Sequence, residues 1–179
     1  PFHVGKASVR ENLISQRAQE HGIPIIYVNL VGGQDDLIFD GRSYYFNKEG
    51  EKVVQAKAFQ EDLLFFPLNE KANNCPQEDM LKDVFDALVL GVRDYIHKNN
   101  FRKVVIGLSG GIDSAVTVAI AVKALGAENV IGVTMPSKFS SVGSVKDSQQ
   151  LATNLEITMY TLPIKECFES YLKSVEPLF

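Results

Sequence analysis

The chain has 179 residues, of which 45% are hydrophobic, so its length is enough for one or two domains with a substantial core. Its formal net charge is −4, and no basic patch with interleaved aromatic residues is present, which argues against nucleic-acid binding. No apolar run reaches 18 residues, so no membrane span is expected. Cys75 and Cys167 are too few for a disulfide framework; we interpret them as inert thiols and expect a cytoplasmic protein.

The first third predicts a helix followed by strands. Residues 8–11, Ser-Val-Arg-Glu, form a capping-box pattern, and the helix they open is expected to end at His21-Gly22. Residues 23–31 form an apolar run with β character. Residues 32–36 are rich in Gly and Asp and predict a loop.

A meander of short antiparallel strands is expected next. Residues 37–39 and 42–46 flank Asp40-Gly41, a pair that favours a tight hairpin turn. Residues 52–59 and 61–66 predict two further strands.

The composition changes near residue 67. We therefore predict one domain over residues 1–66, a linker over 67–76 and a second domain over 77–179. The second domain is expected to open with a long helix over residues 77–99. Its apolar positions have helical spacing and predict a core-facing stripe made of Leu81, Val84, Phe85, Leu88, Val89, Val92, Tyr95 and Ile96.

The second domain then alternates strands and helices. Strands are predicted over residues 103–106, 129–135 and 157–162. One helix is predicted to end at Gly126, and another to run from a capping box at residues 144–147 to Leu155. This order indicates an α/β fold with an open parallel sheet, which binds ligands beyond the carboxyl ends of its strands.

The most informative segment joins the first of these strands to the first helix. It reads Gly-Leu-Ser-Gly-Gly-Ile-Asp-Ser and comprises Gly107, Leu108, Ser109, Gly110, Gly111, Ile112, Asp113 and Ser114. A Walker A loop is excluded because no Lys follows Gly111, and the glycine spacing excludes a dinucleotide fingerprint. Glycines before a helix start expose backbone N–H groups that bind phosphate, so we predict an ATP site. The alternative is a glycine-rich turn without a ligand.

Side chains of this segment suit a magnesium-bound phosphate. Ser109 and Ser114 can donate hydroxyl hydrogen bonds to phosphate oxygens. A bare phosphate repels Asp113, so we interpret its carboxylate as a ligand of Mg²⁺.

A second loop is expected at the same edge of the sheet. Residues 136–143 are mostly polar and follow the second predicted strand. Ser137, and with it Lys138, Ser140 and Ser141, are candidate ATP contacts, although an ordinary solvated loop explains them equally well. The three histidines, His3, His21 and His97, have no metal-binding spacing.

The motif Ser-Gly-Gly-Ile-Asp-Ser resembles the loop of the N-type ATP pyrophosphatases, which include NAD, GMP and asparagine synthetases. Pro-Phe-His-Val-Gly-Lys at the start, and later Val-Asn-Leu-Val-Gly-Gly-Gln-Asp-Asp-Leu-Ile-Phe-Asp-Gly-Arg-Ser, resemble the tail of a nitrilase-like glutaminase domain. Joined to Gly-Val-Thr-Met-Pro-Ser at residues 132–137, they resemble the glutamine-dependent NAD synthetases over essentially the whole chain.

The resemblance implies a ligase of NAD biosynthesis. ATP would activate the carboxylate of deamido-NAD as an adenylate, and ammonia from glutamine would convert it to NAD. Lys6 matches the family lysine that helps to bind glutamine. The Glu, Lys and Cys triad of the glutaminase lies upstream in the family, so no catalytic residue is assigned here. We expect an internal fragment that is inactive by itself, and a homo-oligomer.

The loop motif also fits other classes of protein. GMP and asparagine synthetases share the loop but pair it with other glutaminases, and a non-catalytic ATP-binding module has the same motif. By residue type alone, Lys6 is an ordinary surface lysine before a helix.

Overall fold

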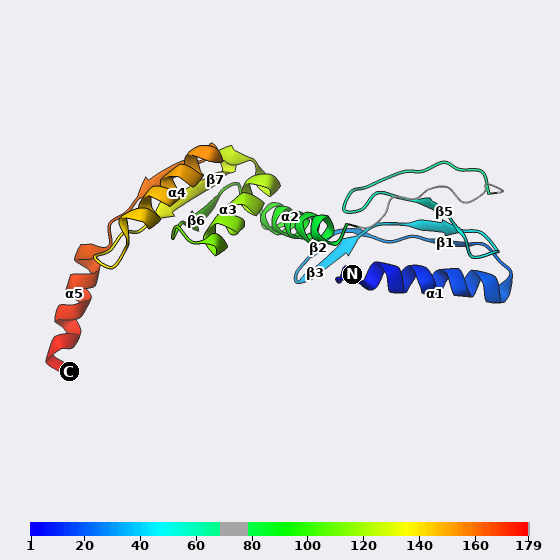
Figure 1. Ribbon diagram of the computed structural model, residues 1–179, viewed down its shortest axis with the longest axis horizontal. Coiled ribbons are helices and arrows are strands. Elements are labelled where there is room, and N and C mark those ends of the chain that lie inside the picture. Colours follow the sequence, from blue (N-terminus) through cyan, green and yellow to red (C-terminus); the bar gives the residue numbers. More distant parts are fainter. Residues whose placement is uncertain (69–78, 179) are drawn as a thin grey trace. The chain divides into compact units, whose positions relative to one another are not determined.

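The computed structural model describes residues 1–68 and 79–178, which form two compact units, Pro1–Tyr95 and Ile96–Phe179 (Figure 1). Each unit combines helices with a sheet, and the second contains a parallel sheet, so the predicted α/β class is confirmed. The predicted linker over residues 67–76 falls almost wholly outside the described residues, so the domain boundaries remain a prediction. No helix of the described residues is long and apolar enough to cross a bilayer.

The first unit packs helix α1 (Lys6–His21) against an antiparallel sheet (Figure 1). That sheet has the order β1-β4-β5, with strands Ile25–Tyr27, Tyr44–Phe46 and Lys52–Gln55. Strands β2 (Val31–Gln34) and β3 (Leu37–Asp40) form a separate antiparallel pair. The core under α1 consists of Ile14, Ala18, Tyr44 and Phe46.

Helix α1 begins earlier than predicted and without a capping box. It starts at Lys6, after Gly5 with a φ of 78°, and the Ser8 hydroxyl donates to the Gly5 carbonyl instead of accepting from a first-turn N–H. The predicted end is confirmed, because Gly22 closes the helix in the left-handed conformation.

The hairpin predicted at Asp40-Gly41 is wrong. Strand β3 pairs with β2 around a turn at residues 35–36, whereas β4 pairs with β1 and β5. Gly41 does have a positive φ of 63°, but the chain passes from one sheet to the other at this residue. A Cβ at position 41 would lie 2.6 Å from the Cγ2 atom of Val31. The strand predicted over residues 61–66 is also absent from this described segment.

A buried ion pair joins α1 to the end of β3. The Arg10 guanidinium contacts the Asp40 carboxylate at 2.7 and 3.2 Å, and Asn29 donates to the same carboxylate at 2.9 Å. The guanidinium lies over the rings of Tyr27 and Tyr44. Burial lowers the pKa of Arg10, but the hydrogen bonds to Asp40 and Tyr44 outweigh it and raise this pKa overall. The guanidinium of Arg10 therefore stays charged despite its burial.

Helix α2 (Met80–Lys98) packs a different face from the predicted one. Its buried residues are Asp83, Ala87 and Leu90, whereas Leu81 and Leu88 of the predicted stripe are 77% and 45% exposed. Asp83 pairs with the buried guanidinium of Arg42. Hydrophobic spacing identified the helix, but a charged side chain with a buried partner lies on its packed face, which apolar periodicity does not detect.

The second unit is a parallel sheet in the order β6-β7-β8, with strands Val104–Gly107, Val130–Thr134 and Thr158–Thr161. Helix α3 (Ile112–Leu125) contacts β6 and β7, and α4 (Val142–Asn154) contacts β7 and β8. These strands and α3 confirm the predicted alternation. The core consists of Leu108, Val118, Ala121, Val130, Ala152 and Ile157.

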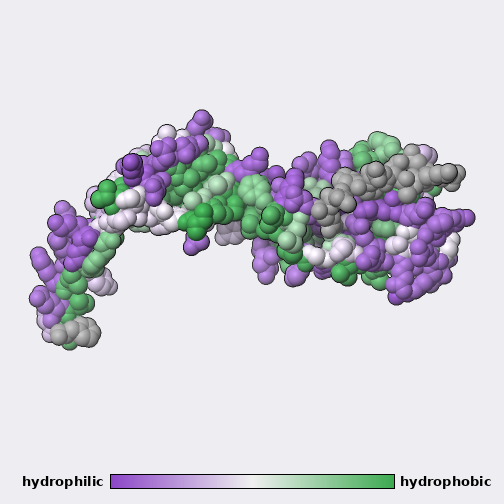
Figure 2. Space-filling model, in the orientation of Figure 1, coloured by the Kyte–Doolittle hydropathy of each residue, from purple (hydrophilic) through white to green (hydrophobic). Residues whose placement is uncertain are grey.

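Helix α5 (Lys165–Val175) follows β8, and short 3₁₀ turns lie at Ala127–Asn129 and Glu176–Leu178. None of the α5 residues is buried. Figure 2 shows hydrophilic residues on one side of α5 and hydrophobic residues on the other. The helix is therefore amphipathic, with its apolar side open.

Replacement of Asp40 tests the buried ion pair. Asp40→Asn leaves the Arg10 charge buried without its counterion and is expected to lower the free energy of unfolding by about 3 kcal/mol. Urea unfolding measures the loss. Glu20→Gln is the matched control, because it breaks the exposed pair with Arg17 on the same helix and is expected to cost about 0.5 kcal/mol. Equal losses for the two variants would contradict this role.

Candidate phosphate-binding site

The loop from β6 to α3 lies at the carboxyl edge of the parallel sheet. Leu108 is buried and packs over Gly132 of β7, where a Cβ would lie 2.7 Å from its Cδ1 atom. Its backbone N–H donates to the Val133 carbonyl at 2.8 Å. The following residues, Ser109 to Asp113, are exposed. Leu108 therefore anchors the loop to the sheet, and the residues after it are accessible to solvent.

Two serines organise the loop internally. The Ser109 hydroxyl accepts from the Gly111 N–H at 3.2 Å and lies 3.1 Å from the Ser114 hydroxyl. The Ser114 hydroxyl donates to the Gly111 carbonyl at 3.0 Å and accepts from the Ser109 N–H at 3.3 Å. Both hydroxyls therefore stabilise the conformation of the loop, and both remain accessible to a ligand.

Helix α3 begins with unsatisfied donors. Its N-cap residue is Gly111, which has no side chain to accept from the first-turn N–H groups. The amides of Ile112, Asp113 and Ser114 stand in that first turn, where the helix dipole favours negative charge. This is the arrangement that binds phosphate in strand–loop–helix units.

Asp113 is exposed in the first turn of α3. Within residues 1–68 and 79–178, no group of three or more His, Cys, Asp or Glu side chains gathers that could hold a metal by itself. A single carboxylate instead fits Mg²⁺ that is bound mainly by phosphate oxygens and water.

Helix α4 closes one side of the loop. Gly110 has a φ of 79°, and a Cβ on it would lie 2.5 Å from the carbonyl oxygen of Ser144. The first turn of α4 therefore occupies the space that any other residue at position 110 would need. The sequence motif identified the loop, but gave no sign that α4 lies against it.

The predicted start of α4 is wrong by three residues. Ser141 is the N-cap, and its hydroxyl accepts from the Ser144 N–H at 3.0 Å. The helix begins at Val142, so the box predicted at residues 144–147 lies inside it. A serine stands at both positions, but only residues 144–147 have an acidic residue in fourth place, so the capping-box pattern favoured the wrong serine.

The loop before α4 makes contacts of its own. Ser137 accepts from the Phe139 N–H at 3.2 Å, and its own N–H donates to the Ser140 hydroxyl at 3.0 Å. The Lys138 ammonium lies 5.0 and 5.1 Å from the ring centres of Phe139 and Phe168. The structure therefore accounts for these side chains locally, and an ATP contact by Ser137 stays a prediction.

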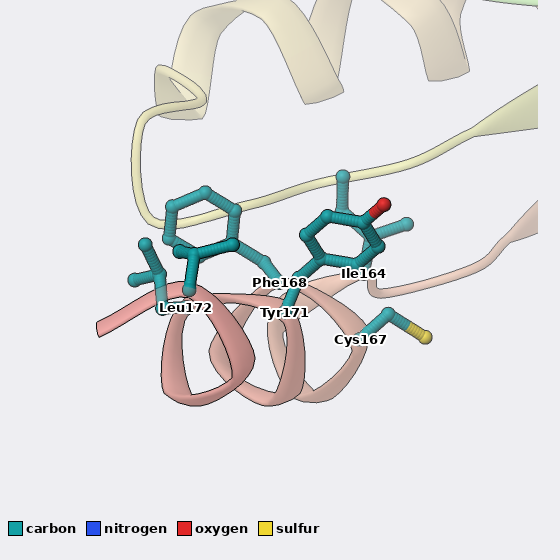
Figure 3. A pocket seen from close by; sticks show the side chains of 6 residues that line it. Ile164, Cys167, Phe168, Tyr171 and Leu172 are labelled. Atoms are coloured by element: carbon teal, nitrogen blue, oxygen red, sulfur yellow. The ribbon is translucent and has the colours of Figure 1, made fainter. Parts of the chain in front are cut away.

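An apolar pocket lies along α5, outside the phosphate loop (Figure 3). It is lined by Ile164, Cys167, Phe168, Tyr171, Leu172 and Val175. These positions share one side of the helix, and the lining offers almost no polar group, so it has no features of a phosphate or metal site.

Lys6 lies in the first unit, as the first residue of α1, and its side chain is exposed. Its N–H donates to the His3 carbonyl at 3.0 Å, which fixes the backbone at the helix start. The position leaves the ammonium available to a carboxylate ligand.

A parallel α/β unit with a helix that starts after a glycine, without a side-chain cap, at the carboxyl edge of the sheet is typical of the nucleotide-binding class of proteins. A model of the NAD synthase family matches residues 84–178, which is more than half of the chain. The chain belongs to the NAD synthase family.

Individual relatives agree with this assignment. A glutamine-dependent NAD(+) synthetase from Synechocystis is 46% identical over the whole of this chain and 33% of its own length. The solved glutamine-dependent NAD+ synthetase from Acinetobacter baumannii, in complex with ADP, has 39% identity and a TM-score of 0.94 over 100% of this chain and 35% of its own. An NMN synthetase from Francisella tularensis has 32% identity and a TM-score of 0.52 over 56% of this chain and 41% of its own. The chain thus spans about a third of the length of the glutamine-dependent relatives.

Replacement of Gly110 tests the close approach of α4. Gly110→Ala combines a positive φ with a contact to the Ser144 backbone, and is expected to lower the free energy of unfolding by about 1–3 kcal/mol. Gly143→Ala is the control, because the nearest atom to its Cβ is 3.7 Å away. Thermal unfolding compares the two. A Tm of the Gly110 variant equal to that of the control would contradict the packing described.

Proposed function

We propose that the protein to which this chain belongs makes NAD from deamido-NAD, ATP and ammonia released from glutamine. Membership of the NAD synthase family supports this reaction. So does the likeness to relatives that are named glutamine-dependent NAD(+) synthetases. The same family match favours NAD formation over the GMP and asparagine synthetase alternatives.

The single observation that carries the proposal is the open start of α3 after Gly111. The first-turn amides and the hydroxyls of Ser109 and Ser114 bind the β and γ phosphates of ATP. The Acinetobacter baumannii relative was solved in complex with ADP, which is consistent with a site for an adenine nucleotide. Ser137 is the further candidate contact, from the loop after β7.

The chemistry follows from that placement. The deamido-NAD carboxylate attacks the α phosphorus, the bond to the bridging oxygen breaks, and pyrophosphate leaves. The fixed amides stabilise the negative charge that develops on the leaving group, so the loop needs no general base. Ammonia then attacks the carbonyl carbon of the adenylate, and AMP leaves.

Asp113 would hold Mg²⁺ together with phosphate oxygens, and the ion would supply neutralisation of part of the phosphate charge. Its position in the first turn of α3 supports this role. The carboxylate would otherwise repel the phosphates that the helix start attracts.

The first part of the chain accounts for the ammonia source. Residues 1–66 are the end of a nitrilase-like glutaminase domain, residues 67–76 are a linker, and residues 77–179 begin the synthetase domain. Lys6 binds the carboxylate of glutamine. The protein is a cytoplasmic homo-oligomer.

The direct test is incubation of the full-length protein with deamido-NAD, ATP, Mg²⁺ and glutamine. NAD, AMP and pyrophosphate are expected in equal amounts, and their absence would refute the reaction. The chain of residues 1–179 alone is expected to bind ATP without turnover, since it spans a third of its relatives. A non-catalytic binding module would bind ATP in both forms and form no AMP.

Removal of the Asp113 charge tests the metal role. Asp113→Asn is expected to raise the KM for Mg-ATP on the order of tenfold, with partial recovery at high Mg²⁺. Asp147→Asn is the matched control, because Asp147 is an exposed carboxylate on α4. A KM that is unchanged in the Asp113 variant, or raised equally in both, would exclude this role.

Removal of the Lys6 charge is expected to affect activity with glutamine and not activity with ammonium salts. Lys6→Met is expected to raise the KM for glutamine at least about tenfold, because a charge-assisted hydrogen bond to a carboxylate is lost. Activity with ammonium salts is expected to stay within about twofold of the unsubstituted protein. Steady-state NAD formation with each nitrogen source measures this. Equal losses with both sources would contradict a glutamine contact.

A further inference from the structure

One buried hydroxyl faces the phosphate loop from α4. Ser148 is 1% exposed, and its hydroxyl donates to the Ser144 carbonyl in its own helix at 2.9 Å. The same oxygen lies 3.4 Å from the carbonyl oxygen of Leu108, at the start of the loop. It is therefore a shared donor between α4 and the loop.

The contact acts on the first peptide group of the loop. In a trans peptide the C=O and N–H point in opposite directions. The Leu108 carbonyl meets the Ser148 hydroxyl, and the Ser109 N–H of the same peptide meets the Ser114 hydroxyl at 3.3 Å. This peptide plane is thus held on one side by α4 and on the other by α3.

A second contact fixes the distance between α4 and the loop. The Ser144 backbone occupies the place where a Cβ of residue 110 would lie, so the helix cannot move closer, and the Ser148 hydroxyl opposes its moving away. These contacts together restrain the Leu108–Ser109 peptide and the spacing between α4 and the loop.

We propose that Ser148 is a positioning residue, which holds the Leu108–Ser109 peptide so that the loop presents its amides and hydroxyls to the ATP phosphates. This deepens the proposed function and rests on it. Ser148 does not touch the nucleotide, and its effect is on the preorganisation of the loop.

The test compares Ser148→Ala with Thr153→Val in the full-length protein. Both changes remove a hydroxyl that donates to the carbonyl four residues earlier in α4. Thr153, however, is exposed, and among the described residues its hydroxyl bonds to Gln149 alone. Alanine is a better helix former than serine, so the Ser148 variant is expected to fold. Calorimetry with Mg-ATP gives the Kd, and steady-state kinetics give the KM values for ATP and for deamido-NAD.

Ser148→Ala is expected to raise the Kd and the KM of Mg-ATP about three- to tenfold, with the KM for deamido-NAD unchanged. Thr153→Val is expected to leave all three within about twofold. Equal effects of the two variants, or a parallel rise in both KM values, would overturn the positioning role. Failure of the unsubstituted protein to bind Mg-ATP would overturn the proposed function and this inference with it.

Discussion

The second unit depends on the close approach of α4 to the loop at Gly110. The backbone of Ser144 fills the position of a missing side chain, and Gly110 has the positive φ that only a glycine adopts without strain. Because of this contact, the starts of α3 and α4 meet at one edge of the sheet. The anion binding that we propose for the loop rests on backbone geometry more than on any charged side chain.

The sequence predicted the second unit well because its signals are local. Alternating apolar runs and helices predict parallel strands, and Gly126 marks the end of α3 as expected. The loop was predicted as a unit because its motif combines glycine, serine and aspartate in a strand-to-helix context. The contact of Ser148 with Leu108 joins residues forty positions apart, and no local pattern encodes it.

The first unit shows where local signals fail. Asp40-Gly41 has hairpin chemistry, yet Asp40 is buried by its partners Arg10 and Asn29, and the chain changes sheets there. The Ser8–Glu11 pattern suits a helix cap, but the N-cap lies three residues earlier, at Gly5. On α2, the face that carries Asp83 is packed, because Asp83 pairs with Arg42, and this face differs from the predicted apolar stripe. In each case a distant partner overrides the local preference.

Lys138, with the rings of Phe139 and Phe168, connects the loop after β7 to α5. Phe139 meets Phe168 edge-to-face at 5.7 Å, and the Ile164 N–H donates to the Pro136 carbonyl at 3.2 Å. The loop and the first turn of α5 are therefore joined by one backbone hydrogen bond and one aromatic contact. Phe168 is therefore the side chain through which a substitution on α5 would reach the polar loop at the carboxyl edge of the sheet.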